Sequence, residues 1–403
     1  MGKKIQSLDL TIGYNFLGIL YSKNTLSDNK SICPQLTDDF LQKLNSCIGK
    51  LLYKLEKEYT GSNINWNDCS VYTGVSGIAL LYVRLYDIGI RPDGLQTALK
   101  FVEPCLQKLK NAKASFLCGD SGPLCVAALV YKRLNNVDKY ESCVNQLINL
   151  RAIAMKGDTP DEILSGRAGY LYSLLFIKER VTSVDEELIR SIVKEIVRSG
   201  RSYGDPDSLG VSLMFEWHGK RYLGAAHGVS GIISMLFKSG LVDSRQLSKE
   251  VDCLRALQFK SGNYPSSLPI GSDKLVHWCH GSPGFTFMFV EAYRKTGAEC
   301  HLKSAVDCAE SIWRMGLLRK GYGLCHGIAG NAYALLTVYQ TTQDIKYLHR
   351  AAKFAEFCFD YGKHGCKQPD RPYSLFEGLA GTIYFLVELL EPMSAKFPSF
   401  DDV

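Results

Sequence analysis

The sequence predicts an all-α fold, an α,α-toroid in which seven inner helices form a barrel and seven outer helices surround it. Three observations carry this prediction. A short glycine element recurs along the 403-residue chain, an apolar run follows each copy, and strand signals are weak. No Asn-Gly or Asp-Gly hairpin joins two β-branched runs, and apolar and polar residues show no regular alternation.

The recurring element reads Gly-x-x-Gly, and the mean spacing of its copies is about 51 residues, enough for two helices and their connections. Its first glycines are Gly74, Gly119, Gly166, Gly228, Gly281, Gly327 and Gly378. The run after each element is apolar nearly all round, as expected of a helix that is buried on both sides. These runs are therefore predicted to be the inner helices.

The segments between the glycine elements have the pattern of half-buried helices. From Leu95 to Leu109, apolar residues recur at helical spacing with lysines between them, although Pro104 predicts a bend or a break. An open stack of such repeats exposes an apolar face at each end, and closure into a ring hides both faces. We expect one domain over residues 1–403, with an N-terminal segment and the first outer helix in residues 1–50 and the repeats in residues 51–403.

The composition fits a globular protein and excludes several classes of function. Hydrophobic residues make up 46% of the chain and charged residues 22%, and the net charge of +6 is spread along the sequence, so no nucleic-acid partner is expected. The apolar segments are short and are interrupted by charges such as Arg84 and Glu291, which argues against a seven-span membrane receptor. Peripheral association with the plasma membrane stays open.

The N-terminus indicates where the protein resides. It has no apolar core of a secretory signal, so we expect a cytoplasmic protein. In that reducing compartment the 14 cysteines are expected to be free thiols.

Chemically reactive side chains stand directly before the glycine elements. The residues before the first glycine include Cys118, His227, His280 and His326. Cys279 and Cys325 each stand one position earlier in their repeats. In a ring, equivalent positions lie at the same height around the axis, so these side chains are expected to meet at one mouth of the barrel.

Three of these residues form a predicted zinc site. Zinc prefers thiolate and imidazole ligands, and catalytic zinc sites use three protein ligands with a fourth position open. Cys279, Cys325 and His326 make such a set. Each residue taken alone is more often a packing or capping residue, and it is their equivalent placement in the repeats that favours a metal site. Cys118 lacks a neighbouring histidine and is expected to be a packing residue.

Cationic residues also stand near the glycine elements. Arg167 lies inside the third element, Lys320 shortly before Cys325, and Lys367 before the last element. Cations around a metal site would suit an anionic substrate that carries carboxylates.

Four segments carry a resemblance to a known family. They read "AAHG" (225–228), "VHWCHGSPG" (276–284), "GYGLCHGIAGN" (321–331) and "SLFEGLAGT" (374–382). With "FLCGDSGPL" (116–124) and "SGNYPSS" (261–267), they resemble the lanthionine synthetase C-like family, most closely its eukaryotic members. The resemblance implies an α,α-toroid with one zinc ion, held by Cys279, Cys325 and His326.

The resemblance also implies a chemistry. The bacterial cyclases of the family add a cysteine thiol of a peptide to a dehydroamino acid, and the eukaryotic members bind glutathione and are taken to add its thiol to such residues. His227 matches the catalytic histidine of the family, and His280, where the bacterial enzymes commonly carry tyrosine, is expected to share in proton transfer. For the catalytic Asp of the cyclases, Asp161 is a guess.

The family pattern further places cations on the carboxylates of glutathione. Lys320 takes one of these positions, and Lys367 stands where the family has Arg, so the charge is kept but the bidentate fork is lost. Lys3 or Lys4, with Lys4 preferred, would supply a basic residue near the N-terminus.

The sequence therefore predicts a zinc-dependent glutathione transferase that adds glutathione to dehydroalanine or dehydrobutyrine residues in peptides or damaged proteins. A protein kinase is a further candidate partner. The alternative is a non-catalytic adaptor in redox signalling that holds zinc and glutathione.

Overall fold

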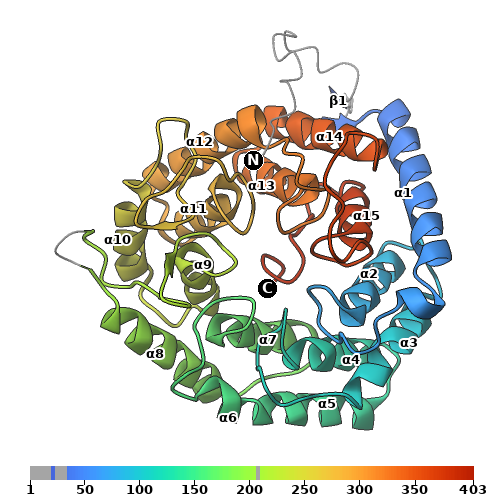
Figure 1. Cartoon of the computed structure of the whole chain (residues 1–403), viewed down its shortest axis with the longest axis horizontal. Coiled ribbons are helices and arrows are strands. Elements are labelled where there is room, and N and C mark those ends of the chain that lie inside the picture. The colour runs from blue at the N-terminus through green and yellow to red at the C-terminus, as the bar shows by residue number, and fades with distance from the viewer. Residues whose placement is uncertain (1–19, 23–33, 206–208) are drawn as a thin grey trace, which may run out of the picture.

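The helices form two concentric rings around a central axis (Figure 1). The computed structural model describes residues 20–22, 34–205 and 209–403. The inner ring consists of α2 (Val75–Asp87), α4 (Ser121–Arg133), α7 (Arg167–Arg180), α9 (Val229–Ser239), α11 (Ser282–Thr296), α13 (Ile328–Thr342) and α15 (Leu379–Glu388). The outer ring consists of α1 (Asp38–Glu58), α3 (Gly94–Leu106), α5 (Val137–Asn149), α8 (Glu186–Ser202), α10 (Ser244–Arg255), α12 (Glu299–Met315) and α14 (Ile345–Phe359). The predicted toroid of seven inner and seven outer helices is confirmed.

The remaining elements are short. Helix α6 (Arg151–Ala154) follows α5, and a single 3₁₀ turn covers Gly61–Asn63. Two small antiparallel sheets pair β1 (Leu20–Ser22) with β2 (Pro34–Leu36), and β3 (Arg221–Tyr222) with β4 (Ser267–Leu268). Among the residues that the structure describes, no helix combines the length and apolar character needed to cross a membrane.

The two rings differ in burial as their sequences predict. In α4 every residue from Ser121 to Tyr131 is buried, whereas α8 buries a stripe that includes Leu188, Ile192 and Ile196. In α3, Pro104 lies inside the helix, which ends two residues later at Leu106. Proline has no backbone N–H, so one hydrogen bond is missing from the second half of this helix.

Both glycines of each element are required because the backbone of the preceding loop passes close by. A Cβ atom at Gly330 would lie 1.8 Å from the carbonyl oxygen of Leu324, and the second glycine of each other repeat meets the carbonyl six residues earlier in the same way. Gly281 has a φ of 111°, a conformation that L-residues with side chains rarely adopt. The glycines therefore bring each loop onto the first turn of its inner helix.

Backbone hydrogen bonds join six of the seven neighbouring pairs of these loops, and we call the joined segments the main-chain ring. They are the residues two positions before each first glycine and their neighbours. The amide of Cys279 donates to the carbonyl of Cys325 at 3.2 Å, and Cys325 donates to Phe376 at 2.8 Å. Phe376 donates to Tyr72 at 3.1 Å, which links the last repeat to the first. Further bonds run from Tyr72 to Leu117, from Cys118 to Leu164 and from Ile163 to Ala226. Equivalent positions of neighbouring repeats are thus held side by side.

The C-terminal residues fill the other end of the barrel, and Figure 1 shows the C-terminus at the centre of the inner ring. The carboxylate of Asp402 accepts hydrogen bonds from Tyr172 at 2.7 Å and from Arg180, the last residue of α7, at 3.2 Å. Lys238, in the last turn of α9, forms a 3.0 Å ion pair with Asp401. We call residues 395–403 the C-terminal plug.

The C-terminal plug also supports the loop that leads into α11. The ring of Trp278 stacks on Phe397 with centroids 5.2 Å apart and meets Phe400 edge to face at 5.3 Å. All three side chains are fully buried. Because Trp278 precedes Cys279, the plug packs directly beneath the mouth that holds the reactive side chains.

Candidate metal centre and its surroundings

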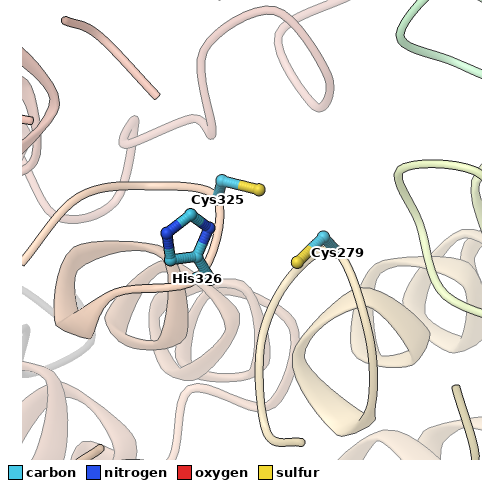
Figure 2. A group of neighbouring side chains, drawn as sticks. All are labelled: Cys279, Cys325 and His326. Carbon is cyan, nitrogen blue, oxygen red and sulfur yellow. The ribbon is translucent and has the colours of Figure 1, made fainter. Parts of the chain in front are cut away.

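Cys279, Cys325 and His326 converge as predicted from their places in the repeats. Cys279 comes from the loop before α11, and the other two come from the loop before α13 (Figure 2). Their ligand atoms, two sulfurs and a ring nitrogen, all lie within 4.8 Å of one another. The hydrogen bond between Cys279 and Cys325 in the main-chain ring fixes this approach.

The chemistry of this group fits a zinc ion. The neighbouring Cys279 sulfur, followed by burial, raises the pKa of the Cys325 thiol well above its ordinary value. The hydrogen bond with Cys325 in turn raises the pKa of His326. A bound divalent cation would remove the cost of ionising these crowded thiols, because thiolate is the ligand form of cysteine. Two sulfurs and one nitrogen leave the fourth tetrahedral position open, as in catalytic zinc sites.

His227 lies in the same mouth and is held by a buried carboxylate. Its Nδ1 atom lies 2.9 Å from Oε2 of Glu162, whose side chain is only 1% exposed. Glu162 also accepts hydrogen bonds from the backbone amides of Leu164, at 2.8 Å, and Ser165. A carboxylate can only accept in this arrangement, so His227 donates from Nδ1 and presents Nε2 for proton exchange. The indole of Trp217 stacks on the imidazole at 4.2 Å.

His280 and Tyr222 link His227 to the metal group. The ring of Tyr222 lies 5.7 Å from that of His227 and 5.9 Å from that of His280, which is adjacent to Cys279 in the chain. Burial, followed by the charge of His227, lowers the pKa of His280 to about 4. His280 is therefore a neutral imidazole near pH 7.

Several residues of this site were missed by the sequence analysis. Trp217 and Lys220 flank a tight hairpin whose central residues, His218 and Gly219, have φ values of 50° and 69°. This turn places the ammonium group of Lys220 5.4 Å from the centre of the Tyr222 ring. The signal available in the sequence was Gly219, because glycine readily adopts the positive φ that a two-residue hairpin needs.

His277 was also missed. Its ring lies 6.2 Å from that of His326, and neither of its nitrogens has a hydrogen-bond partner in the described part of the chain. Burial, followed by the charge of His326, lowers its pKa to about 3, so it is neutral.

Two expectations in the third repeat are corrected. Asp161 does not contact His227; it pairs with Arg167 at 2.9 Å and accepts from Ser199, and its neighbour Glu162 takes the place beside His227. The side chain of Arg167 is 3% exposed, and its guanidinium donates to the Asp161 carboxylate and to two backbone carbonyls. It is therefore a buried structural cation and is unable to reach the carboxylates of a ligand.

Of the other predicted cations, Lys320 and Lys367 lie in the described part of the chain and Lys4 does not. Lys320 is exposed, and its charge contributes to the lowered pKa of both His277 and His280, which places it near the mouth. Lys367 is also exposed, and its backbone amide donates to the carbonyl of Arg319, beside Lys320. Lys4 lies outside the described residues.

Comparison with known proteins adds the family. The model of the family described as "Lanthionine synthetase C-like protein" matches residues 65–401. The chain is 45% identical over 377 residues to the Danio rerio protein named glutathione S-transferase LANCL1, covering 91% of this chain and 93% of that protein. The solved structure of nisin cyclase superposes with a TM-score of 0.67 and 15% identity, covering 88% of this chain and 95% of the cyclase, and this likeness supports the fold. The chain therefore belongs to the lanthionine synthetase C-like protein family.

Proposed function

We propose that this protein is a zinc-dependent glutathione transferase that forms a thioether between glutathione and a dehydroalanine or dehydrobutyrine residue of a peptide or damaged protein. The observation that carries the proposal is the placement of the Cys279–Cys325–His326 group and the His227–Glu162 pair at one mouth of the barrel. The relative named glutathione S-transferase LANCL1, at 45% identity, supports glutathione as the thiol substrate.

The reaction joins sulfur to carbon without any redox change. A bound zinc ion would lower the pKa of the glutathione thiol, so that thiolate is available at neutral pH. The thiolate attacks the β-carbon of the dehydroamino acid, and the π electrons of the C=C bond move toward the carbonyl as an enolate. A proton must then reach the α-carbon to complete the addition.

His227 is suited to deliver that proton. Its Nδ1–H is committed to Glu162 at 2.9 Å, so Nε2 is the atom that exchanges a proton with the substrate. The Glu162 carboxylate orients the ring so that Nε2 faces away from it. The stacked indole of Trp217 restricts ring rotation. The proton released by the thiol balances the one that His227 gives to the α-carbon.

The exposed cations Lys320 and Lys367 are suited to the two carboxylates of glutathione. Both are lysines, so each offers a point charge without the bidentate geometry of arginine. Lys220, next to Tyr222, adds a third cation at the mouth. We propose a cytoplasmic location, where glutathione is abundant enough to serve as a substrate.

The test is mass spectrometry of a dehydroalanine peptide incubated with glutathione and the purified protein. The intact protein is expected to form the adduct. Cys325→Ala is expected to lose the zinc ion of the barrel mouth together with adduct formation, and His227→Ala to keep that ion but lose adduct formation. If zinc-loaded protein forms no adduct on any dehydropeptide, the enzyme proposal fails and the non-catalytic adaptor replaces it.

A further inference from the structure

A second group of metal-ligating side chains lies between two outer helices, apart from the residues of the first group. Asp252 stands near the end of α10, and Cys300 and His301 stand in the first turn of α12. Their ligand atoms, a carboxylate oxygen, a sulfur and a ring nitrogen, all lie within 4.8 Å of one another. Cys253 follows Asp252 in the chain but directs its thiol to the carbonyl of Gly210 at 3.2 Å.

The distances within this group match those around a tetrahedral metal ion. Oδ1 of Asp252 lies 3.2 Å from Nε2 of His301 and 3.8 Å from Sγ of Cys300. Typical zinc bond lengths give about 3.3 Å between nitrogen and oxygen ligands and about 3.6 Å between sulfur and oxygen ligands at a tetrahedral angle. The third pair of ligand atoms, on Cys300 and His301, lies within 4.8 Å, so modest side-chain rotations would complete the site.

The surroundings hold His301 as a ligand. Its side chain is fully buried, and its Nδ1 has no hydrogen-bond partner among the residues that the structure describes. Nε2 is thus directed at Asp252 from a fixed position.

The other two residues leave the group accessible from solvent. The Asp252 side chain is 46% exposed and Cys300 is half-buried, so an ion can enter and can keep a water molecule as its fourth ligand. One opposing charge is present, because Nε of Arg255 lies 3.7 Å from Asp252. That arginine is 40% exposed, so its long side chain is free to turn away into water when a cation binds.

We propose that Asp252, Cys300 and His301 form a second zinc site, which clamps α10 to α12 on the outside of the toroid. Thiolate, imidazole and carboxylate are all zinc ligands, and thiolate disfavours magnesium and calcium. The ion joins the outer helices of two successive repeats, and it stabilises the folded state in proportion to its free concentration. Alkylation of the Cys300 thiol would release it.

The metal content of the full-length protein tests this site directly. Metal-free protein is reloaded with Zn²⁺ and the bound metal is measured by element-specific mass spectrometry, with Co²⁺ as a spectroscopic probe of thiolate ligation. Wild type is expected to bind two ions per chain, Cys300→Ser and Asp252→Asn one, and Cys325→Ala one. Cys253→Ser is the matched control, because it removes the neighbouring half-buried thiol and is expected to leave two.

The outcomes separate this site from the first one. If wild type binds one ion and Cys300→Ser still binds one, the second site does not exist. If wild type binds one ion, Cys300→Ser none and Cys325→Ala one, the outer site stands and the zinc site in the barrel mouth fails. Because Asp252 and Cys300 are at least partly exposed, their variants are expected to fold, and circular dichroism checks this.

Discussion

The His227–Glu162 pair can be tested by replacing Glu162 with glutamine, which keeps the shape of the side chain but removes its charge. The carboxylate accepts three hydrogen bonds, from His227 Nδ1 at 2.9 Å and from the amides of Leu164 and Ser165. Glutamine has one acceptor oxygen, so either His227 or Ser165 faces an amide donor. The bond to His227 also changes from a hydrogen bond to a charged group, worth about 1.5–3 kcal/mol, to a weaker neutral one.

The expected result is a kcat about 10- to 100-fold lower, with little change in the KM for glutathione, because Glu162 acts on proton transfer and not on ligand binding. The assay is the initial rate of glutathione addition to a dehydroalanine peptide, measured by mass spectrometry at several glutathione concentrations. Zinc content is measured in the same preparations.

Asp161→Asn is the matched control, because Asp161 is the neighbouring buried acid and pairs with Arg167 at 2.9 Å. It is expected to lower the thermal unfolding midpoint and to leave kcat within about twofold, since it does not contact His227. A Glu162→Gln protein with normal zinc and a wild-type kcat would refute the role assigned to the pair.

Three other variants test separate parts of the molecule. Lys238→Met leaves the carboxylate of Asp401 buried without its 3.0 Å partner and is expected to cost about 3–5 kcal/mol; an unchanged unfolding midpoint in a thermal melt would contradict the C-terminal plug. Burial raises the pKa of Glu310, but the ion pairs with Arg350 at 2.8 Å and Lys346 at 3.0 Å outweigh it and lower that pKa to about 2. Because the folded pKa lies below the ordinary value of 4.5, this stabilisation is complete above pH 4.5 and is lost as the pH falls toward 2. Glu310→Gln, discounted for partial exposure, should therefore lose about 1–2 kcal/mol at pH 7 in denaturant titrations, and a deficit that persists at pH 2 would argue against the ion pair. Lys320→Ala is expected to raise the KM for glutathione about tenfold with kcat nearly unchanged, and an unchanged KM would remove this lysine from the binding site.

The fold and the metal group were predictable from the sequence because both follow from the repeat. The positions of Cys279, Cys325 and His326 relative to their glycine elements already define where they lie in a ring of equivalent units. The main-chain ring then holds Cys279 against Cys325, as the repeat implies. Spacing alone was sufficient for this part of the site.

The residues around His227 could not be predicted in the same way, because their roles depend on the direction of each side chain, which the repeat does not determine. Asp161 and Glu162 are neighbours, and the tertiary register decides which of them faces His227 and which pairs with Arg167. Arg167 was counted among the cations of the site because it lies inside a glycine element, whereas its long side chain reaches the chain segment before its own helix. Trp217 comes from a hairpin outside the repeat pattern and stacks on His227 through a tertiary contact.

The C-terminal plug has a consequence for how the protein is made. Ribosomes add about 5–20 residues per second, so the inner helix that ends at Asp87 is synthesised about 15–65 s before the residues that fill the barrel. The bond from Phe376 to Tyr72, which joins the last repeat to the first, must wait almost as long. During translation the first repeats therefore expose apolar faces until the last repeat and the C-terminal plug have been made. A stop codon before residue 395 would remove the C-terminal plug and leave the buried face of Trp278 uncovered, so the truncated chain is expected to aggregate.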